Sequence, residues 1–458
     1  MEPVPPPSSS PLPGQRWFAL ALVLFFLFLS IPYGVKAWHN GSAFQRWQPQ
    51  ISDLGNGVDI AERYNYPNPP IMALLLYPLA RLPGVAQGLG LSQQAASTLA
   101  ALCWFYIKAA LTLLAFRWVF QFVEEAGRPF PLWAKCMTVL LALRPIMSDL
   151  QHGNVNLFIL FLVVAALTTY HRQRDLLAGV VLGLAIACKV TPALFVPYFV
   201  WKRSWKALAG CAAGIVLFLC PGLVPAALMG WEHNEHHLRS WYADMVHPFV
   251  VEGKVTSEHP NQSLPGLAAR LLTHSPSFST YVNNQYTPTH YDNLLDLDPS
   301  QAHFLVKGCM GLFALLVVWA CRTPTTPRTN WRLSAEFAIV LLGMLLFSER
   351  TWKHHCVTLV VPFAVICYYL AACAPGKGLR AYLIGSLAAS MLLIAMTSNT
   401  ASDAAVDHGK LHQLFAKQAQ VYGAFVLAYF VLLAALVVLL RRPLVQTTPA
   451  AVPLPRAA

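Results

Sequence analysis

The alternation of apolar and polar stretches along the chain predicts a series of membrane-spanning helices. The first apolar run, residues 17–35, approaches the roughly 20 residues that cross the hydrocarbon core of a bilayer. It is long for the core of a signal peptide, so we interpret it as a retained helix. Runs that we also expect to span the membrane lie at residues 98–120, 131–148, 155–170, 207–228, 303–321, 333–347, 356–374, 379–397 and 418–440.

Three shorter apolar runs need a different interpretation. Two of them, residues 176–188 and 193–201, are separated by the polar break Lys189–Pro192. The third, residues 71–82, follows the proline-rich segment Tyr66–Pro70, and proline disfavours the helical conformation in the residue before it. At about 12 residues this third run is too short to cross a bilayer, and we expect it to form a helix at the membrane interface.

The positions of the basic residues predict the topology, because lysine and arginine favour the cytoplasmic side of a membrane. If both short pieces cross while residues 71–82 stay at the outer face, every basic short loop lies inside, including Lys202–Lys206. This arrangement gives about twelve crossings and places both ends of the chain in the cytoplasm. Short, broken helices are tolerated beside a water-filled cavity, so we expect the pair around residues 189–192 to face one.

The predicted organisation is one transmembrane domain, residues 16–440, between two cytoplasmic tails. Residues 1–15 are rich in proline and serine and are expected to be disordered, and residues 441–458 form the second tail. The domain carries a first outer loop at residues 36–97 and a large outer loop at residues 229–301. Chemistry at the outer face must therefore come from these loops and from the outer ends of helices.

Composition supports a polytopic membrane protein and excludes several other classes. The 458 residues are 56% hydrophobic and only 11% charged, whereas soluble domains carry about 25% charged residues. The net charge of +12 resides in short loops, which argues against a nucleic-acid-binding surface. The ten cysteines lie in or beside apolar segments and form neither a disulfide framework nor a Cys-x-x-Cys metal pair.

Carboxylates in the first outer loop are candidates for a catalytic base. Asp53 and Asp59 are the leading ones and Glu62 is the third. We favour Asp53, because the Gly55–Gly57 turn that follows could let its carboxylate move, whereas Asp59 is closer to the rigid segment that begins at Tyr66. The alternative for each is a helix cap or a solvated loop charge.

Cationic side chains at the outer helix ends are candidates for binding a phosphate. Lys189 stands at the break of the short apolar pair, where an ionisable residue is costly and suggests function. The alternative is that its ammonium group reaches the interface. Further candidates are Arg144 and a dense cluster that could instead anchor the chain at the interface together with Trp352; the cluster consists of Arg350, Lys353, His354 and His355.

Amide and imidazole groups near the same face could recognise sugar hydroxyls. Gln151, His152 and Asn154 are the main candidates, although a helix start explains the asparagine equally well. The large outer loop is rich in histidine, with His233, His236 and His237 close together. This spacing alone fixes no second ligand cluster, so we expect no metal site.

Five motifs, in order, resemble those of glycosyltransferase family 87. They are YPNPPIMALLLYPLARLP, QHGNVNLFILFLVVAAL, ACKVTPALFVPYFVWKR, NQSLPG and TWKHHCVTLVVP, and the fourth adds Asn261 and Gln262 to the substrate-binding candidates. The resemblance implies a GT-C fold with interfacial helices in the first outer loop. It also implies inverting transfer of a hexose, usually mannose, from a polyprenyl phosphate to a lipid or glycan acceptor. The reaction would take place on the outer face of the cell membrane, without a cofactor or nucleic acid.

The sequence departs from the family at one position that matters. The family's catalytic aspartate usually precedes a turn resembling Gly57–Asp59 by about a dozen residues, which corresponds here to Ser42–Phe44 and offers no carboxylate. Either Asp53 or Asp59 has taken over, or the activity has changed or been lost. A lipid-linked sugar transporter is a further alternative. Transport favours broken helices in both halves of a chain, and the single break at residues 189–192 favours an enzyme.

Overall fold

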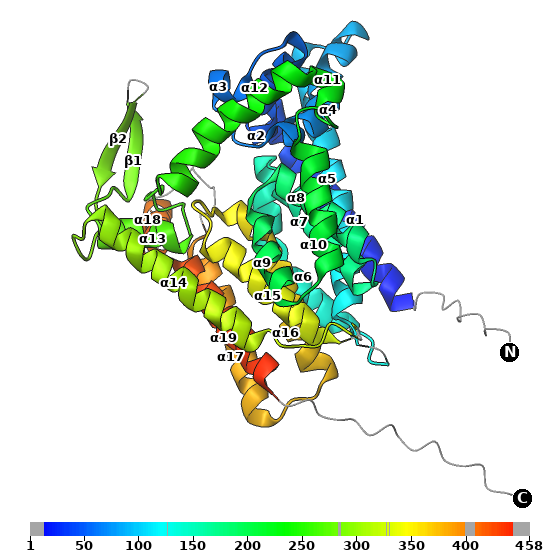
Figure 1. Ribbon diagram of the computed structural model, residues 1–458, viewed down its shortest axis with the longest axis vertical. Coiled ribbons are helices and arrows are strands. Elements are labelled where there is room, and N and C mark those ends of the chain that lie inside the picture. Colours follow the sequence, from blue (N-terminus) through cyan, green and yellow to red (C-terminus); the bar gives the residue numbers. More distant parts are fainter. Residues whose placement is uncertain are drawn as a thin grey trace, which may run out of the picture.

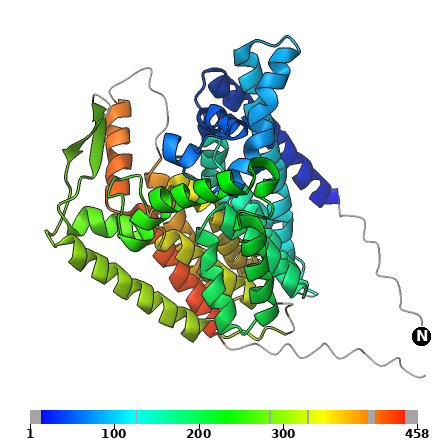
Figure 2. The ribbon, with the colours of Figure 1, turned by 45° about the horizontal axis from the view of Figure 1, so that its top comes forward.

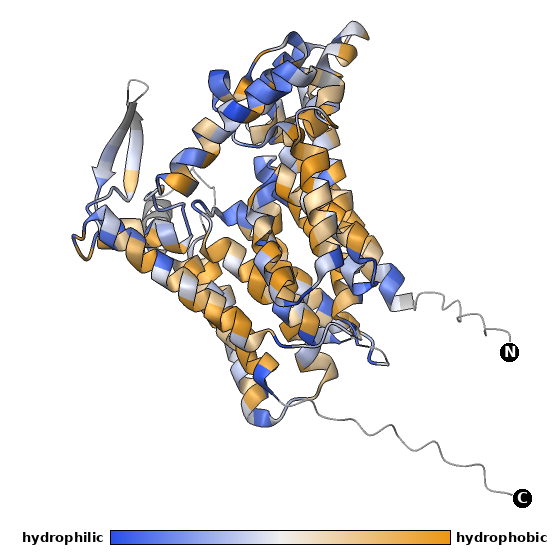
Figure 3. Cartoon of the chain, in the orientation of Figure 1, coloured by the Kyte–Doolittle hydropathy of each residue, from blue (hydrophilic) through white to orange (hydrophobic). Residues whose placement is uncertain are grey.

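The computed structural model describes residues 13–125, 127–282, 285–326, 328, 330–398 and 408–442. Within these residues the protein is a bundle of helices with one small hairpin (Figure 1). Residues 1–12 and 443–458, which make up most of the predicted tails, lie outside the described part. The bundle is apolar along its length and polar at the end that carries α2, α3 and α12 (Figure 3).

Seven of the described helices are long and apolar enough to cross a membrane, which confirms an all-α polytopic protein. The number of crossings and the GT-C fold stay predictions. The seven are α1 (Pro13–Trp38), α4 (Pro70–Gly88), α5 (Gln93–Val123), α14 (Pro299–Ala320), the continuous η4 (Lys353–Leu359) and α16 (Val360–Ala372), α17 (Lys377–Met396) and α19 (Ala424–Arg441). Shorter apolar helices are α7 (Asn156–His171), α8 (Asp175–Cys188), η2 (Thr191–Leu194) with α9 (Phe195–Trp201), and α10 (Trp205–Leu219). The predicted spans at 131–148 and 333–347 correspond to α6 (Leu132–His152) and α15 (Trp331–Leu346).

The run that was predicted to form a short interfacial helix is longer than expected. Helix α4 starts at Pro70, where proline suits the first helical position, and continues through Pro83 to Gly88. Its buried residues pack against α2 and α5. At 19 residues it has the length of a membrane span, so its place at the interface stays a prediction.

The two predicted outer loops are largely helical. The first contains α2 (Ala43–Ser52), the 3₁₀ turn η1 (Asp53–Asn56), α3 (Ile60–Tyr64) and α4. The large loop contains α11 (Ala226–Met229), α12 (Trp231–Trp241), the π-helix η3 (Tyr242–Val251), α13 (Leu264–Leu272) and the antiparallel hairpin β1 (Phe278–Val282) and β2 (Gln285–His290). Helix α18 (His408–Val421) precedes α19. Helix α12 lies against α3 and α4, so segments far apart in the sequence form one layer (Figures 1 and 2).

Glycines bring α8 and α10 into backbone contact. Gly179 and Gly183 lie one turn apart on α8, and Gly210 and Gly214 occupy the same spacing on α10. A Cβ atom at Gly210 would stand 2.1 Å from the Leu176 carbonyl oxygen, so no larger residue fits without moving a helix. Small residues at this spacing allow close helix packing in membranes.

Buried ion pairs fix the end of the bundle opposite α2 and α12. Lys202 follows α9 and its ammonium group lies 2.8 Å from the Glu336 carboxylate of α15, to which Tyr198 also donates a hydrogen bond. Arg328 donates to the Asp175 carboxylate at the start of α8. Lys202 and Arg328 belong to predicted inner loops, so these two ion pairs attach the loops to the helices.

The substitution Gly210→Ala is expected to destabilise the protein, because its methyl group would collide with the backbone of α8. Overpacking of this kind typically costs about 1–3 kcal/mol. Gly308→Ala on α14 is the matched control, since open space surrounds that position and alanine favours a helix. Thermal unfolding in detergent should show a lower midpoint for the first variant only. Equal midpoints would mean that the contact is looser than described.

Candidate functional site

A cavity of about 1300 Å³ opens between the outer helical layer and the bundle. It is larger than the roughly 300–1,000 Å³ of most small-molecule pockets, which suits a substrate with a bulky or extended group. Its lining comes from segments that are far apart in the sequence, and its charged, polar and aromatic residues include Arg46, Trp47 and Tyr64; His152 and Asn154; Lys189; Phe249, Glu252 and Lys254; His303 and Lys307; and Glu349, Arg350, Trp352, His354 and His355.

A buried ion pair is connected to the cavity lining through hydrogen bonds. Lys108 of α5 is fully buried, and its ammonium nitrogen lies 2.8 Å from the Asp149 carbonyl oxygen and 3.3 Å from its carboxylate. The same carboxylate accepts hydrogen bonds from the Asn156 amide side chain and from the Leu157 backbone at the start of α7. The unpaired N–H groups of a helix start are thus satisfied by a charged acceptor.

The network continues from Asn156 to the cavity. Its side-chain oxygen accepts a hydrogen bond of 2.5 Å from the Lys189 ammonium group, which lines the cavity between α8 and η2. Removal from water lowers the pKa of Lys189 to about 8, although the nearby Glu349 and Asp149 carboxylates act in the opposite direction. Lys189 therefore carries its positive charge at neutral pH and loses it above pH 8.

Two histidines and an asparagine form a second wall. The rings of His152 and His354 stack at 4.9 Å, and the Asn154 amide nitrogen lies 3.1 Å from Nε2 of His354. His355 has its Nδ1 within hydrogen-bond distance of backbone atoms of Arg350 and Trp352, which leaves Nε2 for a ligand. These polar groups can recognise hydroxyl groups.

The cavity lining carries more positive than negative charge. Its cations are Arg46, Lys189, Lys254, Lys307 and Arg350, and its carboxylates are Glu252 and Glu349. Glu252 is already paired, at 2.9 Å from the Lys254 ammonium group and 3.1 Å from His247. Arg350 is fixed by hydrogen bonds to the Thr256 hydroxyl and lies over the Trp352 ring. The arrangement suits an anionic ligand and leaves Glu349 as the cavity carboxylate without a described ion pair.

Comparison with known proteins identifies the family of the chain. Residues 66–349 match the model of glycosyltransferase family 87. The chain belongs to this family. Its matched region contains Lys189 and ends at Glu349, so it covers most of the cavity lining.

Curated relatives of this family-87 chain are mycobacterial mannosyltransferases. Two are named polyprenol-phosphate-mannose-dependent alpha-(1-2)-phosphatidylinositol mannoside mannosyltransferase. The protein from Mycobacterium tuberculosis is 25% identical over 76% of this chain and 73% of its own length, and that from Mycolicibacterium smegmatis is 27% identical over 74% and 68%. A pentamannoside mannosyltransferase from M. tuberculosis is 26% identical over 64% of this chain and 56% of its own length. No solved structure matches the chain.

Five of the predicted substrate-binding residues of this family-87 chain line the cavity: His152, Asn154, Lys189, His354 and His355. Others have different contacts. Arg144 donates to the Ile394 carbonyl and Lys353 donates to the Thr397 carbonyl. These two side chains therefore connect neighbouring helices. The Gln151 carbonyl accepts a hydrogen bond from Lys36 near the cavity edge.

Asn261 and Gln262 of the NQSLPG motif are completely buried. The Asn261 amide donates to the backbone carbonyl of Glu349, and the Gln262 amide donates to that of Gln420. Asn261 therefore positions the segment that carries Glu349 and Arg350 along the cavity.

Neither predicted base lines the cavity. Asp59 caps α3, where one carboxylate oxygen accepts from the backbone nitrogens of Ala61 and Glu62. Asp53 accepts a hydrogen bond of 2.6 Å from the Tyr64 hydroxyl, and the Tyr64 side chain does line the cavity. Asp53 is thus connected to the cavity only through Tyr64.

Sequence reasoning did not select Arg46, Lys254, Lys307 or Glu349 as site residues. Glu349 stands within the polar segment that precedes His354, and its place beside predicted site residues could have identified it. Lys307 is an ionisable residue within the apolar helix α14, the same signal that selected Lys189, and the packing of α14 places it on the cavity lining.

The substitution Lys108→Met should destabilise the protein by about 3–5 kcal/mol, because it leaves the Asp149 carboxylate buried without its partner. Arg239→Met provides the control, since Arg239 pairs with Glu235 at the surface, where such pairs contribute roughly 0–1 kcal/mol. Unfolding by denaturant in mixed micelles measures both. A similar small loss for the two variants would contradict the importance assigned to the buried pair.

Proposed function

We propose that this chain transfers a hexose, expected to be mannose, from a polyprenyl-phosphate donor to a lipid or glycan acceptor. The observation that carries the proposal is the cationic cavity, which combines Lys189 and Arg350 with the hydroxyl-recognising groups of His152 and Asn154. The names of the relatives support the donor and a lipid-linked acceptor. We place the reaction at the outer face of the cell membrane, as the distribution of basic loops predicts.

The leaving group of this reaction is the polyprenyl phosphate. As the bond between the sugar and the phosphate oxygen breaks, negative charge grows on the phosphate, and preorganised cations stabilise it. Lys189 is the cation proposed to contact the phosphate, and His355 is proposed to add a hydrogen bond through Nε2; Arg350 also lines the cavity. Lys189 is held by Asn156, so its ammonium group requires little rearrangement.

The acceptor hydroxyl needs a base as its oxygen forms the new bond to the sugar. We propose Glu349 for this role in place of Asp53, because its carboxylate lines the cavity and Glu252 is already paired. Attack opposite the leaving phosphate would invert the configuration of the sugar carbon. The proton passes from the hydroxyl to Glu349, and the electron pair of the broken bond leaves with the phosphate.

One observation favours a second candidate function, a relative that binds the donor without transferring its sugar. Ser42, in the segment Ser42–Phe44 where the resemblance to the family would place an aspartate, is buried and caps α2 by accepting from the Gln45 backbone. Its hydroxyl also contacts the Gln45 side chain, so this position contributes to local structure.

Purified protein incubated with radiolabelled polyprenyl-phosphate mannose and a membrane-lipid extract should form a labelled glycolipid. Glu349→Gln should slow transfer by about 10²–10⁴-fold, because the base is lost while the shape is kept. Asp53→Asn and Glu252→Gln are the matched controls and should retain transfer within roughly tenfold.

If Asp53→Asn abolished transfer in a folded protein while Glu349→Gln did not, the base would be Asp53, as the sequence predicted. If the wild-type protein bound the donor but formed no product with any acceptor fraction, the chain would be an inactive relative.

The affinity for a short-chain polyprenyl-phosphate donor should fall as pH rises above 8. Lys189 attracts the phosphate only while protonated, and its pKa of about 8 means that the charge is lost through this range. Lys189→Arg should keep its affinity to much higher pH, because arginine stays protonated. Equilibrium binding between pH 7 and 9.5 measures both proteins. Parallel curves would exclude Lys189 as the titrating group.

A further inference from the structure

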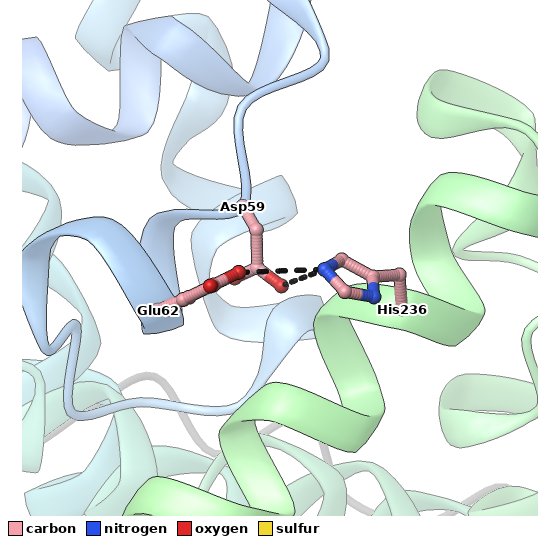
Figure 4. A group of neighbouring side chains, drawn as sticks. All are labelled: Asp59, Glu62 and His236. Atoms are coloured by element: carbon pink, nitrogen blue, oxygen red, sulfur yellow. Dashed lines mark hydrogen bonds and ion pairs between the residues drawn. The ribbon is translucent and has the colours of Figure 1, made fainter.

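A group of three metal-binding side chains lies outside the cavity, where the two outer segments meet. Asp59 and Glu62 belong to the start of α3, and His236 belongs to α12 (Figure 4). Nε2 of His236 stands 3.5 Å from Oδ2 of Asp59 and 3.4 Å from Oε2 of Glu62. The three side chains point toward one another from segments that are more than 170 positions apart in the chain.

Local structure fixes the Asp59 carboxylate, whereas the Glu62 side chain is 68% exposed. Asp59 uses Oδ1 to cap α3, with bonds of 2.9 Å and 3.1 Å from backbone nitrogens, and this directs Oδ2 toward His236. Glu62 occupies the first turn of the same helix. Two carboxylates held together repel each other, and a cation between them removes that cost.

Oδ2 of Asp59 is an independent indication of a ligand. The Asp59 side chain is only 10% exposed, and within the described residues its Oδ2 is buried without a hydrogen-bond partner. A buried charged oxygen normally has a partner or binds a metal. Its contact in the structure is the His236 imidazole at 3.5 Å, which forms an ion pair only when that imidazole is protonated.

The spacing of the three ligand atoms suits a small divalent ion. Zinc bonds to imidazole nitrogen and carboxylate oxygen at about 2.0–2.2 Å in a tetrahedral arrangement, which places neighbouring ligand atoms roughly 3.3–3.5 Å apart. The distances from His236 to the two carboxylates fall in this range. Zinc also binds imidazole and carboxylate ligands, and this site offers one imidazole and two carboxylates.

Further polar groups of α12 lie close in sequence to His236. His233, one turn before His236, lies against the turn that precedes Asp59, since a Cβ atom at Gly57 would be 2.7 Å from its Nε2. His237 and Asn234 are buried, and their side-chain nitrogen and oxygen atoms have no hydrogen-bond partner among the described residues. Polar groups near a metal orient its ligands.

We propose that Asp59, Glu62 and His236 bind a divalent cation of the zinc class, with a fourth position open to water. The ion would connect α3 to α12. Both elements border the cavity, through Tyr64 at the end of α3 and Trp241 at the end of α12. Binding of the ion would therefore set the distance between two walls of the cavity, although none of its three protein ligands lines the cavity. The histidine spacing alone did not predict this site, because its carboxylates come from another segment.

The experiment measures metal binding by the full-length purified protein, independently of transfer. After removal of metal with a chelator, titration with Zn²⁺ is followed by elemental analysis and by competition with a chromophoric indicator. Co²⁺ serves as a spectroscopic probe, because its visible absorption reports the coordination. We expect about one equivalent of Zn²⁺ per chain and a higher thermal midpoint when it is bound.

Variants identify the ligands. Glu62→Gln and His236→Gln should each lower the Zn²⁺ affinity at least tenfold, and Asp59→Asn should do the same while keeping the helix cap, since asparagine caps equally well. Glu235→Gln is the matched control, because this neighbouring residue of α12 pairs with Arg239. It should leave the affinity unchanged.

Two results would overturn the proposal. The first is a wild-type protein that stays well below one equivalent of Zn²⁺ and shows no thermal shift. The second is equal affinity in His236→Gln, Glu62→Gln and the Glu235→Gln control, which would mean that the ion binds elsewhere. A normal elution profile for each variant excludes misfolding as the cause of a loss.

Discussion

The buried Lys108–Asp149 ion pair is the interaction on which the site depends. A charge in the interior of a membrane protein must be paired, and here one carboxylate satisfies both an ammonium group and the first N–H groups of α7. Because the pair joins α5 to the end of α6, and Asn156 extends it to Lys189 after α8, the network fixes four segments relative to one another. The position of Lys189 in the cavity follows from this network.

The sequence predicted that the bundle is helical, because long apolar runs have few alternatives in a membrane. It was wrong on some helix ends: the predicted span 207–228 corresponds to α10, which ends at Leu219, and the predicted span 418–440 is divided between α18 and α19. It also selected Lys189, His354 and His355, whose charge or polarity stands out among apolar neighbours. It could not predict that polar residues 229–301 fold into α12 and α13, since those helices depend on tertiary contacts. The candidate base was chosen by its position along the chain. Which carboxylates line the cavity depends instead on how the helices and loops pack, and this cannot be read from the sequence.

The charged groups of the protein divide between the two ends of the bundle and differ in how they are satisfied. At one end Lys202, Glu336, Arg328 and Asp175 are paired with each other, and the loops there are tied to the helices. At the other end several cations line an open cavity. A charged residue in a structural ion pair is neutralised by its partner, whereas a residue that binds a ligand must keep part of its charge accessible. This contrast, together with membership of family 87, separates the binding end from the structural end.

The glycine contact between α8 and α10 has a consequence for the surrounding lipid. These helices of 14 and 15 residues are about 21–23 Å long, shorter than the roughly 30 Å of a bilayer core. Their outward side chains, including Leu176, Leu177 and Val216, are exposed and apolar. In the predicted topology, thinning of the bilayer beside them is one way to relieve the hydrophobic mismatch. A lipid-borne phosphate would then travel a shorter distance between the membrane and Lys189, so local membrane thickness becomes part of how the site is reached.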